Sequence, residues 1–513
     1  MMRTPIRLIA CLAALALAAC SSLEPRPDLP VEAAVPAATG TTLDDLIAGA
    51  EATRPGQSGF RLVRDGPEAF AIRSRTALVA GRSLDVQTYI WHDDGTGIYL
   101  AARLFEAAER GVKVRLLVDD MDARSKNYSF AALHAHPNIE VRMFNPFETR
   151  SGTLRLAFEA MGSAKRLNRR MHNKTWIADN RIAVVGGRNL GDEYFGASEE
   201  VNFVDLDFAM VGPIVREASA SFDRYWNSPL AYPMDVLAPE AVSAEALQAL
   251  RDRIAARMPA ADKSRFADEL RHSDSVQRLV SGDWPMQWSS NFRFVSDDPL
   301  KALGKSDGIE GSQVLASLGP LMKASTRNVT IISPYFVPGE AGTKFLVGVE
   351  QSGSAVRVLT NSLAANDVAL VYGGYSESRE ELLEGGVELW ELKPTQGTQV
   401  QSSMFGSSGA SLHTKALTVD GRLAFVGSYN LDPRSTSLNC EQGIFVESPE
   451  ISAQLEEIFG KDTSGERAWA VTLRDGKLEW ADGTKTWGSS PDASAGRKFQ
   501  AWLARVLPVS SQL

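Results

Sequence analysis

Short apolar runs alternate with longer segments of helical spacing along most of the chain. In the first such series, the strand-like segment 83–91 is followed by the helix-like segment 99–110 and the apolar run 112–118. Short apolar runs between helical segments are typical of the buried strands of α/β proteins. The pattern therefore predicts an α/β fold built on largely buried sheets.

The same order of segments occurs twice. A second series begins with the strand-like segment 328–336 and the apolar run 356–359. Each series then continues with a short strand, at 139–144 and at 387–392. A repeat of this length predicts two pseudo-symmetric halves, each a mixed, mostly parallel sheet flanked by helices, that share one active site. The expected boundaries are 46–232 for the first half, 233–290 for a helical insertion or linker, and 291–513 for the second half.

The first nineteen residues are expected to be a signal peptide. Arg3 and Arg7 precede an apolar run from Leu8 to Ala19, which is shorter than the ~20 residues that a membrane-spanning helix needs. The run ends in Leu17-Ala18-Ala19-Cys20, which resembles the bacterial lipobox, so Cys20 is expected to be acylated and to become the first residue. The alternative is an ordinary cleaved signal with an incidental cysteine.

Residues 20–45 are expected to form a tether, because prolines lie among small and polar residues there. Ser21 rather than Asp follows Cys20, which by resemblance to Gram-negative lipoproteins favours the outer membrane. These features predict a lipid-anchored envelope protein whose body faces the periplasm.

Net charge argues against a nucleic-acid partner. The chain has 54 Lys and Arg against 63 Asp and Glu, a formal charge of −9, whereas proteins that bind phosphate backbones normally present a dominant basic face. Its three cysteines, two of them before residue 21, cannot build a disulfide framework. No protein partner can be named from the sequence.

Two copies of one motif carry the candidate chemistry. The pattern H-x-K-x-x-x-x-D occurs from His172 to Asp179 and again from His413 to Asp420, although the chain has only six histidines. An asparagine follows each histidine 17 residues later, at Asn189 and Asn430. Agreement over this length excludes chance.

The spacing of each motif predicts a shared face and a hairpin. Residues i and i+2 of a strand point the same way, so His172 and Lys174, like His413 and Lys415, are expected to be neighbours. Turns at 179–180 and 420–421 then return each chain beside its own histidine. One His, one Lys and one Asn from each half would surround a single tetrahedral anion.

These motifs resemble those of the phospholipase D superfamily, whose two copies meet across a pseudo-twofold axis. The resemblance covers nearly the whole chain from about Gly59, and it is strongest to bacterial cardiolipin synthases, the C type in particular. The segments that carry this closer similarity are 85–97, 187–195, 205–207, 222–226 and 333–339.

The resemblance implies a phosphohistidine mechanism without a metal or other cofactor. One neutral imidazole attacks the phosphodiester phosphorus, and the other protonates the leaving alkoxide and later deprotonates the acceptor. By this analogy His172 is the nucleophile and His413 the general acid/base, with the reverse assignment left open. Lys174, Lys415, Asn189 and Asn430 would hold the phosphoryl oxygens.

Acidic residues are expected in supporting roles. Asp179 and Asp420, at the turn ends of their strands, are read as structural. The family also places an acid behind each histidine to fix its tautomer. Glu441 fits this role in the second half, and Asp205 in the first, although Glu200 has the spacing that matches Glu441.

The implied activity is a phosphatidyltransferase that forms cardiolipin from phosphatidylglycerol and a second phospholipid, with phosphatidylethanolamine as a candidate donor. The alternatives are a hydrolytic phospholipase D that releases phosphatidic acid, a nuclease-type phosphodiesterase, and a non-catalytic envelope lipoprotein. Transferase and hydrolase use the same residues and differ in whether an alcohol or water reaches the phosphohistidine.

Overall fold

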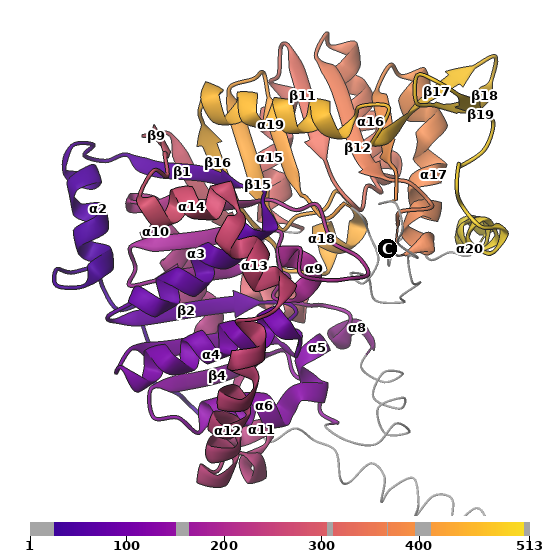
Figure 1. Ribbon diagram of the computed structural model, residues 1–513. Helices are drawn as coiled ribbons and strands as arrows, with labels where there is room; N and C mark the ends of the chain where they lie inside the picture. The colour runs from indigo at the N-terminus through magenta and orange to yellow at the C-terminus, as the bar shows by residue number, and fades with distance from the viewer. Residues whose placement is uncertain (1–24, 150–163, 305–310, 367, 395–411, 507–513) are drawn as a thin grey trace, which may run out of the picture.

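The computed structural model describes residues 25–149, 164–304, 311–366, 368–394 and 412–506. These residues form two sheet-based halves that lie side by side (Figure 1). The first sheet has nine strands in the order β8-β4-β3-β2-β5-β6-β7-β1-β9. Its strands are β1 Ser58–Val63, β2 Ser83–Thr88, β3 Lys113–Asp119, β4 Ile139–Phe144, β5 Thr175–Ala178, β6 Ile182–Gly186, β7 Asp207–Val211, β8 Ala231–Pro233 and β9 Gln287–Ser289.

The second sheet has ten strands in the order β10-β16-β15-β14-β11-β12-β13-β17-β18-β19. Its central run β13-β12-β11-β14-β15-β16 repeats the run β4-β3-β2-β5-β6-β7 of the first sheet, which confirms the two pseudo-symmetric halves. Its strands are β10 Phe292–Ser296, β11 Asn328–Ile332, β12 Ala355–Asn361, β13 Glu388–Leu392, β14 Ala416–Val419, β15 Leu423–Gly427, β16 Gln442–Glu447, β17 Ala468–Arg474, β18 Lys477–Ala481 and β19 Thr486–Trp487.

Both sheets are mixed, as expected. The expectation that they are mostly parallel is wrong, because most pairs of neighbouring strands are antiparallel. Among the described strands, the parallel pairs are β2–β3, β3–β4, β11–β12 and β12–β13, and the remaining neighbours are antiparallel. Helical crossovers join the parallel strands, whereas a tight hairpin joins β5 to β6 and β14 to β15. Each hairpin turn has two residues with positive φ, Asp179 and Asn180 in one and Asp420 and Gly421 in the other, as two-residue hairpins favour.

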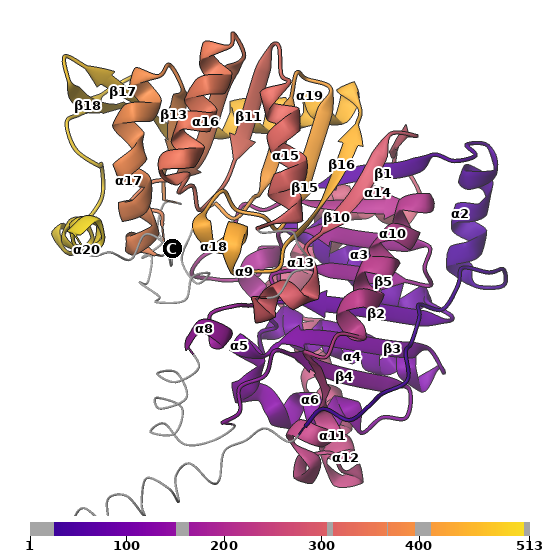
Figure 2. The ribbon, with the colours of Figure 1, turned by 180° about the vertical axis from the view of Figure 1, so that it is seen from behind.

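Helices flank both sheets (Figure 2). Those up to the end of the first half are α2 Thr42–Ala52, α3 Gly66–Val79, α4 Gly95–Glu109, α5 Asp120–Ala123, α6 Asn127–His134, α8 Ala164–Leu167, α9 Asp192–Phe195 and α10 Pro213–Trp226, with a 3₁₀ turn at Arg124–Lys126. Those of the second half are α15 Gln313–Lys323, α16 Gly339–Gln351, α17 Ala369–Glu384, α18 Pro433–Ser437, α19 Pro449–Asp462 and α20 Ala495–Val506, with a 3₁₀ turn at Pro299–Leu303.

The region between the halves is largely helical and packs onto the first half. Its α12 contacts α4 and α6, and its α14 contacts α3, while β9 adds an edge strand to the first sheet. Its helices are α11 Met234–Leu237, α12 Ala244–Ala261, α13 Arg265–His272 and α14 Asp274–Ser281, with a 3₁₀ turn at Pro239–Ala241.

One hydrophobic cluster belongs to both halves. It joins Val185 and Phe208, from β6 and β7, to Val426 and Ile444, from β15 and β16. Because β6 and β15 are the return strands of the two motif hairpins, the shared core brings the two motifs to a common boundary. Burial of this apolar surface stabilises the contact between the halves.

Residues 25–41, here called the N-terminal strap, have no helix or strand and lie against the first half. The Arg26 guanidinium donates to the Ala231 carbonyl at 2.8 Å, and the Ala34 N–H donates to Asp223 at 2.8 Å. The Glu32 carboxylate pairs with Lys113 and Arg142. Figure 2 shows the strap crossing the molecule toward α2. The part of the expected tether that the structure describes is therefore fixed to the body. Among the described residues, no helix has the length and apolar character needed to cross a bilayer.

Candidate active site

The histidine of each motif lies just before the motif hairpin, and its backbone pairs with the other half of the chain. The His172 N–H donates to the Cys440 carbonyl at 2.9 Å, and the His413 N–H donates to the Val204 carbonyl at 2.8 Å. The expectation that the His and Lys of each motif lie within its strand is therefore wrong, because β5 and β14 begin at the third residue after each histidine. The histidine backbones bond across the boundary between the halves instead of to their own sheet.

This backbone pairing places an acid of the opposite half behind each histidine. Glu441 follows Cys440, and its Oε2 lies 3.0 Å from His172 Nδ1. Asp205 follows Val204, and its Oδ2 lies 2.6 Å from His413 Nδ1. A carboxylate at Nδ1 accepts that N–H and leaves the lone pair on Nε2, which is the atom available for chemistry.

The expected pairing of these acids within each half is thus incorrect. Asp205 lies in the first half but contacts the histidine of the second, and Glu441 contacts the histidine of the first. Glu200, the other candidate, is exposed, and its N–H bonds to Ser198. Spacing along one half could not reveal this exchange, because it depends on how the halves dock.

The two motif lysines are buried and hold equivalent positions. Lys174 Nζ donates to the His172 carbonyl at 2.6 Å, and Lys415 Nζ donates to the His413 carbonyl at 2.6 Å. Burial, together with the charge of Lys415, lowers the pKa of Lys174 well below its usual value, although Glu441 opposes the shift. The charges of the two buried lysines act on each other, so a bound anion would stabilise their protonated forms.

Burial also shifts both imidazoles toward their neutral forms. The pKa of His172 falls to about 4, because burial outweighs the opposing charge of Glu441. The pKa of His413 lies well below its usual value because of burial and the charges of Lys415, Lys174 and His172. These mutual effects of residues from both halves indicate a single electrostatic site. A neutral His172 is the form that can act as a nucleophile.

The two asparagines lie in equivalent, buried places. Asn189 Oδ1 accepts the Ile90 N–H at 3.2 Å, and its amide donates to the Tyr194 hydroxyl at 2.8 Å. The side-chain oxygen of Asn430 is buried and has no hydrogen-bond partner among the described residues. Asn189 is thus held in place by protein groups, whereas Asn430 retains an unused polar atom.

Aromatic rings that the motifs did not predict orient both imidazoles. The Tyr89 ring lies edge-on to His172, with centroids 5.2 Å apart. Phe203 stacks on His413 at 5.4 Å, and Tyr194 lies edge-on to the same ring. Phe203 is close to Asp205 in sequence, so one segment supplies both the acid and the stacking ring for His413.

The motif aspartates have the geometry of structural groups. The Asp179 carboxylate accepts the backbone N–H groups of Gly81, Arg82 and Ser83, just before and at the start of β2. Asp420 accepts the equivalent N–H groups before and at the start of β11, those of Thr326, Arg327 and Asn328. Each aspartate ties its hairpin turn to the neighbouring strand, away from the imidazoles. Cys20, the expected acylation site, lies outside the described residues.

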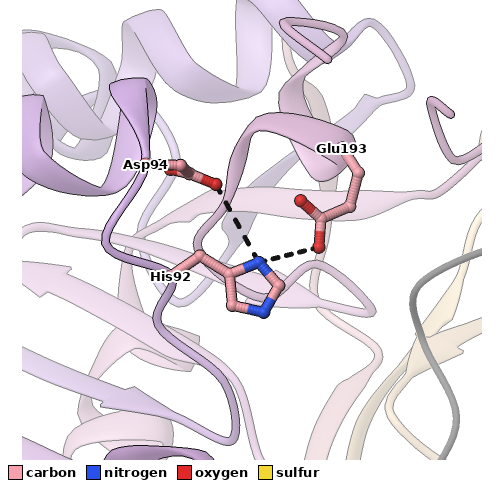
Figure 3. Close-up of side chains that lie close together, drawn as sticks. All are labelled: His92, Asp94 and Glu193. Atoms are coloured by element: carbon pink, nitrogen blue, oxygen red, sulfur yellow. Dashed lines mark ion pairs between the residues drawn. The ribbon is translucent and has the colours of Figure 1, made fainter. Parts of the chain in front are cut away.

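A polar cluster that the motifs did not predict lies near Asn189. His92 Nδ1 is 3.0 Å from Glu193 Oε1 and 3.9 Å from Asp94 Oδ2, and Figure 3 shows both carboxylates directed at that nitrogen. Among the described residues, these three are the group of possible metal ligands whose nitrogen and oxygen atoms all lie within 4.8 Å of one another. Asp94 also caps α4 and accepts the Asp192 N–H at 2.8 Å. The cluster therefore joins the start of α4 to α9, and no short motif marks it in the sequence.

Comparison with known proteins agrees with this geometry. A family model described as "Cardiolipin synthase, PLD-like domain" matches residues 76–226 and 318–463, which include both motifs. The chain belongs to the phospholipase D-like cardiolipin synthase family. It is 40% identical over 472 residues to cardiolipin synthase C of Escherichia coli (strain K12), which covers 89% of this chain and 96% of that protein.

Two more distant matches cover similar lengths. An uncharacterized protein of Helicobacter pylori (strain ATCC 700392 / 26695) is 31% identical over 443 residues, 86% of each chain. The crystal structure of phosphatidylserine synthase from Haemophilus influenzae Rd KW20 matches with a TM-score of 0.57 at 13% identity, over 91% of this chain and 99% of that one. At this identity the likeness concerns the fold, and it supports the arrangement of two docked halves.

Proposed function

We propose that this protein is a phosphatidyltransferase that forms cardiolipin from phosphatidylglycerol and a second phospholipid, with phosphatidylethanolamine as a candidate. The observation that carries the proposal is the pair of buried imidazoles, each bound at Nδ1 by an acid of the opposite half, beside two buried lysines. Its relationship to named cardiolipin synthases supports the choice of substrate.

In the proposed mechanism His172 Nε2 attacks the phosphorus of the donor lipid. The bond from phosphorus to the leaving alkoxide breaks as a phosphohistidine forms, and His413, protonated once the anionic substrate is bound, donates its proton to that alkoxide. His413 then removes the proton from a hydroxyl of phosphatidylglycerol, whose oxygen attacks the phosphohistidine. Lys174, Lys415 and Asn430 are proposed to bind the phosphoryl oxygens as their charge develops.

The proposed setting is the cell envelope. Acylation at Cys20 would attach the protein to a membrane, with the outer membrane and the periplasmic side as the proposed location. The substrates are phospholipids, so a membrane anchor would place the enzyme beside them.

The test uses the purified protein with mixed phosphatidylethanolamine and phosphatidylglycerol vesicles, and mass spectrometry of the lipid products. We expect cardiolipin that disappears in His172→Ala and His413→Ala. Phosphatidic acid without cardiolipin would make the protein a hydrolase. Lipid profiles that are identical for wild type and both variants would exclude an enzyme.

A further inference from the structure

The last helix of the chain exposes two neighbouring aromatic rings. One side of α20 packs against α17, and its Ala501 is buried in the core of the second half. On the same helix, 60% of Phe499 and 54% of Trp502 are exposed, and their rings stack with centroids 5.8 Å apart. Large apolar side chains exposed side by side mark a candidate binding surface.

The charges of α20 differ from those of the whole chain. Its described side chains include the basic Arg497 and Lys498 and no acidic one, in a protein whose formal charge is −9. A helix that combines basic residues with exposed Trp and Phe has the composition of helices that lie in the interface of anionic membranes. Charge complementarity therefore selects an anionic lipid surface as the occupant of this patch.

The position of α20 connects this patch to the active site. Arg497 Nε donates to the Leu363 carbonyl at 2.9 Å, in the loop that follows β12. At the end of β12, Asn361 binds both the N–H and the carbonyl of Leu412, each at 3.0 Å. Leu412 immediately precedes His413. The helix is thus held at the end of β12 that also lies beside His413, one of the two catalytic imidazoles.

We propose that α20 inserts Phe499 and Trp502 into the headgroup region of an anionic phospholipid bilayer and so brings the His413 edge of the second half to the membrane surface. This inference rests on the proposed function for its choice of phospholipid, but binding of the helix does not require turnover. Arg26, near the proposed attachment at Cys20, bonds to β8 of the first half. Because α20 packs on α17 of the second half, and Figure 1 shows it at the opposite side of the molecule from α2, its contact with lipid is separate from the N-terminal attachment.

The test measures binding of the full chain to vesicles. Cys20→Ser removes the acylation site, and because both proteins that are compared keep the same N-terminal residues, the difference between them reports the contribution of α20. In this background, co-sedimentation with phosphatidylglycerol and phosphatidylethanolamine vesicles is compared for the chain with and without Phe499→Ser plus Trp502→Ser. We expect the double substitution to weaken binding by about tenfold or more, since two interfacial aromatic side chains are lost. Vesicles of phosphatidylcholine alone should bind both proteins weakly.

A matched control replaces an exposed apolar residue elsewhere. Leu46 of α2 is 65% exposed, and Leu46→Ser should leave vesicle binding unchanged. In addition, turnover of a short-chain phosphatidylglycerol dissolved as monomers should be the same with and without the double substitution, while turnover of vesicle lipid should fall.

Three results would overturn the inference. One is undiminished vesicle binding by the double variant. Another is an equal loss of turnover on the monomeric lipid, which would place the rings in the fold or the site. The third is a dimer, detected by analytical ultracentrifugation, that the double substitution dissociates, because a second copy would then cover the patch. Absence of turnover on either lipid would count against the proposed function, while vesicle binding would still decide the role of α20.

Discussion

The exchange of acids between the halves determines how each imidazole can act. Glu441 Oε2 accepts the Nδ1–H of His172, and Asp205 Oδ2 accepts that of His413. Burial would raise the pKa of Glu441, but His172, Lys174 and the Ser428 hydroxyl together lower it, so the carboxylate stays charged. Each acid therefore fixes the tautomer of a histidine that lies far from it in sequence.

Replacing each acid by its amide tests this exchange. Glu441→Gln and Asp205→Asn should each reduce kcat roughly a hundredfold to ten-thousandfold, because an amide favours the wrong tautomer. The resonance of the His172 Nδ1–H in spectra of ¹⁵N-histidine-labelled protein should move in Glu441→Gln and stay in place in Asp205→Asn. The reverse response would contradict the exchanged pairing.

The depressed pKa of His172 predicts a stability that depends on pH. In the unfolded chain His172 takes up a proton as pH falls through about 6.5, whereas in the folded protein it does so only near pH 4. The unfolded state therefore binds more protons between these two pH values. The contribution of His172 to the stability of the folded protein is complete above pH 6.5 and is lost as pH falls toward 4.

The protonation of His172 alone should make the free energy of unfolding about 2 kcal/mol lower at pH 5 than at pH 7. Urea unfolding at both values measures the difference. His172→Asn, whose amide can still donate to Glu441, serves as the comparison and should show a smaller decrease. An equal decrease in both proteins would mean that other groups cause it.

Most residues of the candidate site could be predicted from the sequence, because the spacing within each motif does not depend on how the two halves dock. The places of His172, Lys174 and Asn189, and of their second-half equivalents, follow from the hairpin alone. The contacts of Tyr89 and Phe203 with the imidazoles were not predictable in this way. They depend on packing between segments that no local pattern relates.

At the level of elements, each motif hairpin is joined to its neighbouring strand by one aspartate. Asp179 is buried and accepts three backbone N–H groups. Asp179→Ala would leave those donors without an acceptor, so we expect a loss of about 2 to 4 kcal/mol in the free energy of unfolding.

Because this carboxylate lies away from the imidazoles, kcat per folded molecule should stay within about threefold of wild type in Asp179→Ala. Denaturant unfolding and kinetics on the same preparation separate the two effects. A large fall in kcat with unchanged stability would assign Asp179 a direct role in the reaction instead.

The bounds of the elements were more predictable than the directions of the strands. The segment 139–144 was expected as a strand and is β4, and the expected helix 99–110 corresponds to α4. An apolar run shows that a strand is buried on both faces, but it does not show which way its neighbour runs. That explains why the antiparallel pairs β6–β7 and β15–β16 were missed.

At the scale of the whole molecule, neither half holds a complete site. The first half contains His172 but not Glu441, and the second contains His413 but not Asp205. The two are joined through the shared core of β6, β7, β15 and β16.

Expressed separately, residues 25–290 and 291–513 should each be inactive, and mixing them should restore cardiolipin formation where they dock. Lipid mass spectrometry of the separate and mixed fragments measures this. A mixture in which the fragment 291–513 carries Glu441→Gln should stay inactive. Cardiolipin formed by one fragment alone would show that its histidine needs no acid from the other.

The N-terminal strap would also limit how far the protein moves from a membrane into which an acylated Cys20 inserts. Arg26 is bonded to the body, so an acyl group on Cys20 would be joined to a fixed surface by five intervening residues, 21–25. A segment of this length spans at most about 20 Å when fully extended. An enzyme held this closely would work in a thin layer above the membrane that its acyl chain enters, and substrate in a second membrane would stay beyond its reach.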